Sequence, residues 1–287
     1  MPLMEIRDLT HTYSAGTPFE KVAVDHLDLD LEEGRIIGLI GHTGSGKSTL
    51  IQHMNALLKP DSGTVLFRGE DIFASKEIMY RTRFRVGLVF QYPEYQLFEE
   101  TVFADIAFGP KNQKLSADEI DRRVRDAAAF VGLREDMFEK SPLDLSGGQK
   151  RRVAIAGVLA MEPELLILDE PTAGLDPAGR EDLLANLFRW RENRSATILL
   201  VTHDMDTAAR CDDLVVLDRG HVFMQGKPGE IFSHAEELWE LGLGLPEATH
   251  IAMLLRTRGV PLPADIYTLP QLRQAILALA GKEDASC

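Results

Sequence analysis

Cysteine is scarce in this chain, whose 287 residues include only Cys211 and Cys287. Two thiols so far apart in the sequence exclude a disulfide framework and a cysteine-rich metal site. We therefore expect Cys211 to be a reduced packing residue and Cys287 to be a residue of the C-terminal tail.

Long apolar runs are also missing. The most apolar segments are the size of single strands, far short of the roughly 20 residues that cross a bilayer as a helix; they lie at 36–40, 165–168 and 198–201. The N-terminal residues Met1 to Asp8 have neither a basic start nor an apolar signal segment. We therefore expect a soluble chain that remains in the cytosol.

Positive charge is in the minority. Asp and Glu number 45 against 31 Lys and Arg, which gives a net charge of −14. A nucleic-acid binder needs a basic face to meet the phosphate backbone, so no nucleic-acid partner is expected. The acidic balance fits a partner that brings arginine or lysine. With 45% hydrophobic residues, the chain is otherwise typical of a globular protein with a full core.

The apolar pattern indicates two kinds of strand. Residues 4–31 alternate apolar and polar side chains around a turn at 14–18, which is typical of an antiparallel β-region. Later segments are apolar throughout, as parallel strands covered by helices would be; they lie at 36–40, 165–168, 198–201 and 214–217. A further strand is predicted at 86–90.

Helical patterns fill two other parts of the chain. One runs from Gln91 to about Ala160 and is clearest at 117–131, where one face is charged. The other follows Gly229, where prolines separate short amphipathic stretches. The predicted fold class is therefore α/β, with a domain at 1–229, a helical subdomain inserted at about 91–160, and a C-terminal helical extension at 230–287.

A glycine-rich loop joins the strand at 36–40 to a predicted helix. Its sequence is Gly41-His42-Thr43-Gly44-Ser45-Gly46-Lys47-Ser48, which matches the phosphate-loop pattern in full and in the required strand–loop–helix context. The glycines let the backbone wrap a β-phosphate, Lys47 reaches the β- and γ-phosphates, and the Ser48 hydroxyl suits Mg²⁺. A merely structural glycine turn is a weak alternative here.

Polar residues follow several of the predicted strands. Asp169 ends the strand at 165–168, at the sheet edge where ligands gather, and is expected to hold Mg²⁺ directly or through water. Glu170 comes next and is suited to accept a proton from attacking water. His203 either contacts the γ-phosphate or is an ordinary polar residue at a strand end. Gln91 either senses Mg²⁺ or the attacking water or caps a turn. Tyr13 either stacks on adenine or is a packing residue.

The segment Leu145-Ser146-Gly147-Gly148-Gln149 precedes a helix-forming stretch. A small hydroxyl and two glycines at a helix start let backbone N–H groups point at an anion. On its own the segment is better interpreted as a glycine turn capped by Ser146. Beside a phosphate loop and an acidic strand end, it indicates a second phosphate clamp.

These motifs, in this order, resemble the nucleotide-binding subunit of ATP-binding cassette (ABC) proteins over roughly 1–229. The resemblance implies a P-loop NTPase fold and pairs of subunits arranged head to tail, each signature segment (145–149) completing the other's ATP site. It implies an adenine-stacking Tyr13, a Q-loop Gln91, a D-loop at 173–176 and a switch His203. The ATP-binding set it implies is Tyr13, Gly41, His42, Thr43, Gly44, Ser45, Gly46, Lys47, Ser48, Thr49, Ser146, Gly147, Gly148, Gln149 and Asp176, with Mg²⁺ on Ser48, Gln91 and Asp169 and catalysis by Glu170, His203, Lys47 and Gln91.

A narrower resemblance lies at 90–102 and 105–112, which are similar to the ATPases of energy-coupling factor (ECF) transporters. That family implies a groove for coupling helices of a membrane T-component, with Glu94 meeting an arginine. The alternative is an exposed acidic loop with solvated charges. The Pro93-Glu94 and Phe98-Glu99 pairs resemble the second, A-prime type, which pairs with a different A-type subunit.

The C-terminal residues support the A-prime resemblance. Segments 241–246 and 259–263 resemble the family's extension, which packs between the two ATPases. Ile251, Leu254 and Leu255 are predicted to form an apolar face that needs a partner surface, internal or external. A free-standing helical tail is the alternative.

The resemblance implies an ATPase that powers import of vitamins or other micronutrients, bound to the cytoplasmic face of the membrane. Its partners would be a sister A-type ATPase, a T-component and solute-binding S-components. Alternatives are a homodimeric cobalt or nickel importer ATPase, a conventional ABC importer ATPase and, from a different class, a soluble ABC assembly factor.

Overall fold

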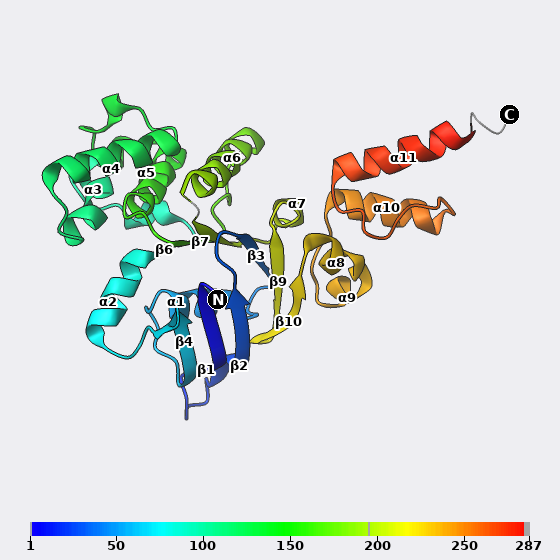
Figure 1. Cartoon of the computed structure of the whole chain (residues 1–287), viewed down its shortest axis with the longest axis horizontal. Coiled ribbons are helices and arrows are strands. Elements are labelled where there is room, and N and C mark those ends of the chain that lie inside the picture. Colours follow the sequence, from blue (N-terminus) through cyan, green and yellow to red (C-terminus); the bar gives the residue numbers. More distant parts are fainter. Residues whose placement is uncertain (1, 195, 284–287) are drawn as a thin grey trace.

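The computed structural model describes residues 2–194 and 196–283 and contains two sheets (Figure 1). The smaller sheet is antiparallel, in the order β2-β1-β4-β5, with β1 (Met4–Tyr13), β2 (Lys21–Leu31), β4 (Ser62–Phe67) and β5 (Glu70–Asp71). The larger has the order β10-β9-β3-β8-β7-β6, with β3 (Ile36–Ile40), β6 (Val86–Val89), β7 (Leu165–Asp169), β8 (Thr197–Val201), β9 (Asp213–Asp218) and β10 (His221–Gly226). Within the larger sheet, the strands β9, β3, β8, β7 and β6 run parallel, and β10 is antiparallel to β9.

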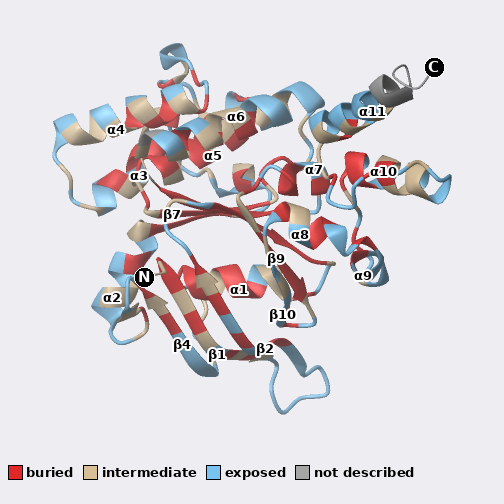
Figure 2. Ribbon diagram, turned by 45° about the vertical axis from the view of Figure 1, so that its right-hand side comes forward, coloured by how far each residue is buried: buried red, intermediate tan, exposed pale blue. Residues whose placement is uncertain are grey.

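The central strands are apolar throughout because both faces of the larger sheet are covered. In β7, Leu166 and Leu168 face the helices, whereas Leu165 and Ile167 face the smaller sheet, and all four are completely buried. Figure 2 shows this buried layer between the helices and the antiparallel strands. The predicted α/β fold with an antiparallel β-region is confirmed.

The helices complete the layers. Predicted helical residues between 91 and 160 form η1 (Pro93–Gln96), α3 (Val102–Asn112), α4 (Ala117–Phe130), η2 (Glu135–Met137), η3 (Pro142–Asp144) and α5 (Gly147–Leu159). The others are α1 (Lys47–Met54), α2 (Lys76–Arg85), α6 (Pro177–Arg194), α7 (Met205–Ala208), α8 (Pro228–Ser233), α9 (Ala235–Glu240), α10 (Glu247–Thr257) and α11 (Leu269–Glu283). Strands β4, β5 and β10 and helices α2 and α6 had no clear signal in the sequence.

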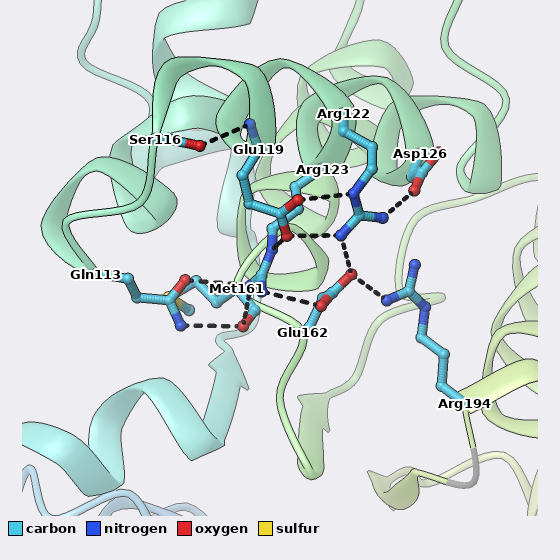
Figure 3. A network of polar contacts seen from close by, with 9 residues as sticks. All are labelled: Gln113, Ser116, Glu119, Arg122, Arg123, Asp126, Met161, Glu162 and Arg194. Atoms are coloured by element: carbon cyan, nitrogen blue, oxygen red, sulfur yellow. Dashed lines mark hydrogen bonds and ion pairs between the residues drawn. The ribbon is translucent and has the colours of Figure 1, made fainter.

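A charged cluster joins the inserted helices to the rest of the fold (Figure 3). Glu162, in the turn after α5, pairs with Arg122 and Arg123 of α4 and with Arg194 at the end of α6. Burial opposes ionisation of Glu162, but the neighbouring arginines prevail and lower its pKa. The cluster therefore fixes α4 against the end of α6.

The C-terminal helices form a small core of their own. Helices α10 and α11 lie side by side at the end of the molecule opposite α3 and α4 (Figure 1). Ile251 and Leu255 pack against this core, whereas Leu254 is 46% exposed. The contacting side of α10 is built on the small residues Ala248 and Ala252. The partner surface is thus internal for Ile251 and Leu255, and an external one for Leu254 stays a prediction.

Among the residues that the structure describes, no helix is both long enough and apolar enough to cross a membrane. Cys211 is a buried free thiol, as predicted, and burial raises its pKa to about 12. Cys287 lies outside the described residues.

Candidate functional site

A cleft of about 640 Å³ opens at the carboxyl ends of the parallel strands. Loops that follow β3, β7 and β8 bring the phosphate loop, the acidic pair and His203 to this edge. The predicted residues that line the cleft are Tyr13, Gly41, His42, Thr43, Gly44, Gly46, Lys47, Ser48, Thr49, Gln91, Asp169, Glu170 and His203. Ligand sites of open α/β sheets lie at this position.

The phosphate loop has a backbone that only glycine adopts easily. Gly46 has φ +106°, and a Cβ there would lie 2.4 Å from the carbonyl oxygen of Ala23. Lys47 Nζ donates to the carbonyl oxygens of Gly41 (2.6 Å) and His42 (2.9 Å), which places the ammonium across the loop. Burial lowers the pKa of Lys47 against the opposing charges of Glu170 and Asp169. An anion in the loop would favour the charged ammonium.

Ser45 departs from the predicted set. It is completely buried, and its side chain does not line the cleft. Its backbone N–H donates to the carbonyl oxygen of His42 (3.2 Å). The side chain of Ser45 is therefore not part of the cleft lining, and its place in the ATP-binding set stays a prediction.

Ser48 and Asp169 form a pair of oxygen donors. Ser48 Oγ donates to Asp169 Oδ2 at 3.4 Å, and Gln91 lines the same cleft. Burial and then the charge of Glu170 raise the pKa of Asp169. A hydroxyl, a carboxylate and an amide suit a hard cation such as Mg²⁺, whose charge would offset the burial of the carboxylate.

Glu170 is held in a strained conformation directly after β7. Its φ is +51°, a region that costs a non-glycine residue about 1–3 kcal/mol. Its backbone N–H donates to the carbonyl oxygen of Val201 (3.0 Å), and its carboxylate lies 2.8 Å from Nδ1 of His203. The side chain of Glu170 is 12% exposed and that of His203 is 76% exposed. The strained turn thus places Glu170 in the cleft, beside the solvent-accessible imidazole of His203.

Tyr13 lies at another part of the cleft wall. Its ring is 40% exposed and packs edge-on against His11, with centroids 4.6 Å apart. Its hydroxyl lies 3.3 Å from Oγ1 of Thr49. The ring is thus fixed in place, yet remains open to a flat ligand.

The sequence analysis missed some of the lining. Lys21 and Ala23, at the start of β2, carry no motif, but their strand lies beside the phosphate loop. Met205 lies two residues after His203, so the predicted position of His203 could have indicated it. Gly242, Leu243 and Gly244 come from the turn between α9 and α10, about 200 residues from the phosphate loop, and no local pattern marks them.

The signature segment lies outside this cleft. Ser146 and Gln149 form a capping box at the start of α5, each side chain accepting from the other's backbone N–H. A Cβ at Gly147 or Gly148 would meet nothing within 4 Å, and neither residue has a left-handed φ. Gly148 and Asp176 line a separate hollow of about 150 Å³. The fold of this chain therefore gives no reason for glycine at 147 and 148.

Glu94 is neither free nor fully solvated. Its carboxylate lies 3.3 Å from the guanidinium of Arg151, whose side chain is 5% exposed. Arg151 also donates to the carbonyl oxygen of Ala173, the first residue of the predicted D-loop at 173–176. Glu94 therefore already meets an arginine, and that arginine belongs to its own chain.

A second groove, of about 450 Å³, lies between α2, α3 and α5. Its exposed aromatic residues are Tyr80, Phe98 and Phe108. Asp105 is 9% exposed in its lining and accepts from the backbone N–H of Phe98, but its Oδ2 has no hydrogen-bond partner. Burial raises the pKa of Asp105. The groove thus combines an apolar surface with an incompletely bonded carboxyl group.

Comparison with known proteins places these features in a family. Residues 24–173 match the family described as ABC transporter. The energy-coupling factor transporter ATP-binding protein EcfA2 of Clostridium tetani is 47% identical over 286 residues, 99% of each chain. A structure of cbiO1 from Clostridium perfringens, described as part of the ABC transporter complex cbiONQ, has a TM-score of 0.74 and 39% identity over 89% of this chain and 99% of its own. A dimeric ATP-binding cassette, MJ0796 bound to ADP and Pi, has a TM-score of 0.71 and 28% identity over 78% of this chain and 98% of its own.

Proposed function

This chain belongs to the ABC transporter family, among the energy-coupling factor transporter ATP-binding proteins, and we propose that its main cleft binds ATP with Mg²⁺ for hydrolysis. It is an ATP-binding and ATP-hydrolysing subunit of an energy-coupling factor transporter. The observation that carries the assignment of the site is the meeting of the phosphate loop, the acidic pair and His203 in one cleft.

Each side chain has a role that its position supports. Lys47 contacts the β- and γ-phosphates, and Ser48, Asp169 and Gln91 hold Mg²⁺, which neutralises phosphate charge when bound. Glu170 orients the attacking water and accepts its proton. His203 exchanges its contact with Glu170 for one with the γ-phosphate, and Tyr13 stacks on adenine.

Replacing Glu170 with glutamine tests this site. Glu170→Gln should keep ATP affinity but slow hydrolysis by about 10²–10⁴-fold, because only the proton-accepting group is removed. The assays are equilibrium binding of ATP and steady-state phosphate release by the assembled complex. Unchanged turnover would refute the role of Glu170. Loss of ATP binding in this variant, which keeps Lys47, would refute the assignment of the cleft as the ATP site.

The ATP site is completed by a second ATPase. Gly147 and Gly148 leave open space at a helix start, where backbone N–H groups and the helix dipole favour an anion. Because this clamp lies outside the chain's own cleft, the phosphate it meets is bound by another polypeptide. The D-loop residue Asp176 lies beside Gly148 and faces the same partner.

That second ATPase is a non-identical sister of the A type. The A-prime resemblance of the segment around Glu94 and of the C-terminal extension supports a heterodimer, in which the extension packs between the subunits. A homodimer is the competing arrangement. Size-exclusion chromatography with ATP, with and without an A-type subunit, distinguishes the two.

The second groove receives helices of the membrane T-component. Its aromatic rim offers apolar contact, whereas Asp105 Oδ2 is buried in the groove wall and cannot reach a partner without rearrangement. Glu94 contacts Arg151, so it can bind a partner's arginine by exchanging it for Arg151. Glu94 is therefore the carboxylate proposed to meet the T-component.

Paired variants test the groove. Glu94→Gln should reduce the amount of T-component that co-purifies from membranes, whereas Asp105→Asn, which changes a carboxyl group buried in the groove wall, should reduce it less. ATP binding by the purified soluble chain, measured in parallel, controls for folding. If Asp105→Asn has the larger effect, Glu94 is not the coupling residue; if Glu94→Arg and Asp105→Asn both leave the complex intact, the groove is not the docking site.

Through the T-component, the chain is held at the cytoplasmic face of the membrane. ATP binding closes the pair of ATPases and hydrolysis opens it, and the inserted helices pass this motion to the groove. Solute recognition lies in separate S-components, and the solutes are vitamins or other micronutrients. Identification of the solute-binding protein that co-purifies tests this last step.

A further inference from the structure

The C-terminal extension reaches into the nucleotide cleft. Gly242, Leu243 and Gly244 of the α9–α10 turn line the same cleft as Lys47 and His203. Leu243 is 6% exposed and belongs to the main hydrophobic core rather than to the small core of α10 and α11. The extension is thus anchored in the ATPase domain at the edge of the site.

Helix α7 makes the contact from the other side. It begins at Met205, two residues after His203, and Met205 is 6% exposed. A Cβ built on Gly244 would lie 3.7 Å from Cγ of Met205, an ordinary van der Waals distance. The turn of the extension therefore lies close to Met205, which follows the His203 loop.

A hydrogen bond fixes the same junction. Helix α10 begins after Pro246, which offers no side-chain cap, so the backbone N–H of Glu247 needs an acceptor from elsewhere. Asp206 of α7 supplies it, with Oδ1 accepting from Glu247 N at 3.1 Å. A carboxylate at a helix start is also favoured by the helix dipole. The helix that follows His203 thus caps the first long helix of the extension.

The contacts at this junction continue along the extension. Thr249 Oγ1 of α10 donates to the carbonyl oxygen of Ile266 (2.9 Å), and Ala248, Ala252 and Leu272 pack in one core. Helices α10 and α11 therefore pack together as one unit, which begins at Glu247. On α11, Leu269, Ile276 and Leu277 are exposed at 53%, 41% and 58%, so the far side of this unit is open to a partner.

We propose that the C-terminal extension positions His203 through Asp206 and the 242–244 turn, so that nucleotide in the cleft and contacts on α10 and α11 influence one another. This inference rests on the proposed role of His203 at the γ-phosphate. Asp206 is a positioning residue, because it acts through α7 and not on the substrate. By linkage, if a partner on α10 and α11 changes the affinity for ATP by some factor, ATP changes the affinity for that partner by the same factor.

The test uses three single variants in the assembled complex. Asp206→Ala removes the cap, Asp206→Asn keeps it because the asparagine amide oxygen also accepts a hydrogen bond, and Asp265→Ala changes an exposed carboxylate elsewhere in the extension. Loss of a helix cap costs about 1 kcal/mol, which shifts the equilibrium between the capped and the released junction about five-fold. We expect kcat to fall about five-fold in Asp206→Ala with KM for ATP unchanged, and both kcat and KM to stay near wild type in the other two.

Tryptophan fluorescence reports the same coupling without turnover. Trp239 of α9 is 48% exposed and packs edge-on against His250 of α10, whereas Trp190 is 1% exposed, so acrylamide quenches Trp239 selectively. In the Glu170→Gln background, ATP should change the quenching, and adding Asp206→Ala should remove most of that change.

The outcomes separate the two proposals. If ATP binds and is hydrolysed but Asp206→Ala leaves kcat and the Trp239 response intact, the coupling is refuted and the ATP site stands. An equal loss in Asp206→Asn would also refute it, because the cap is retained there. If ATP does not bind at all, the site itself is refuted.

Discussion

Replacing Gly148 with alanine should raise stability while lowering activity. A Cβ at this position meets nothing within 4 Å, and the residue lies in the first turn of α5 without a left-handed φ. Alanine is up to about 1 kcal/mol more favourable than glycine in a helix. For a chain of this size, that gain raises the unfolding temperature by roughly 2–4 °C at most.

Activity should move in the opposite direction. In the proposed composite site, the γ-phosphate of the partner's ATP approaches the backbone at 147 and 148, where a methyl group would obstruct it. Losing one preorganised backbone donor to a developing anion lowers kcat by about 10²–10³-fold. We therefore expect Gly148→Ala to fold well, to bind ATP in its own cleft and to lose most of the turnover that depends on its signature segment.

The assay compares calorimetric unfolding of the isolated chain with phosphate release by the assembled complex. Glu139→Ala, an exposed change elsewhere in the inserted helices, serves as the control and should alter neither. Full turnover in Gly148→Ala would refute the composite site. A fall in stability would refute the conclusion that the fold leaves this position open.

Three further results are expected. Burial raises the pKa of Asp169, so its contribution to stability is present below its unfolded pKa of about 4 and is lost as pH rises through the higher folded pKa. Without Mg²⁺ at pH 7, Asp169→Asn should therefore raise the unfolding temperature. A lower unfolding temperature would contradict the direction of this pKa shift. Gly46→Ala should lose ATP binding and stability together, because its φ of +106° and the nearby Ala23 carbonyl leave no room for a Cβ; normal ATP affinity by titration would show that the loop relaxes. In Cys287→Ser, the remaining buried thiol of Cys211, with a pKa of about 12, should resist alkylation at pH 8 until the chain unfolds, and rapid labelling of folded protein would contradict its burial.

The sequence predicted best what depends on neighbouring residues. The phosphate loop needs a strand before it and a helix after it, and the buried strands are apolar over their whole length, so local pattern was sufficient for β3, β7, β8 and α1. The structure confirms where these elements lie in the chain. The chemical roles of their side chains remain predictions.

Contacts between distant segments could not be predicted in this way. Glu94 and Arg151 are 57 residues apart, and no pattern at either position indicates that they meet. The contact of the 242–244 turn with Met205 depends on how α9 and α10 return to the sheet edge. Helical spacing alone also does not reveal that Ala248 and Ala252 form the packed side of α10.

The most direct measurement is the molecular mass of the Glu170→Gln chain, mixed with an A-type sister ATPase, by light scattering with and without ATP and Mg²⁺. The account predicts separate chains without nucleotide and a heterodimer that retains ATP when nucleotide is present, because each signature segment closes the other subunit's site. ATP binding to chains that stay separate under these conditions would contradict it.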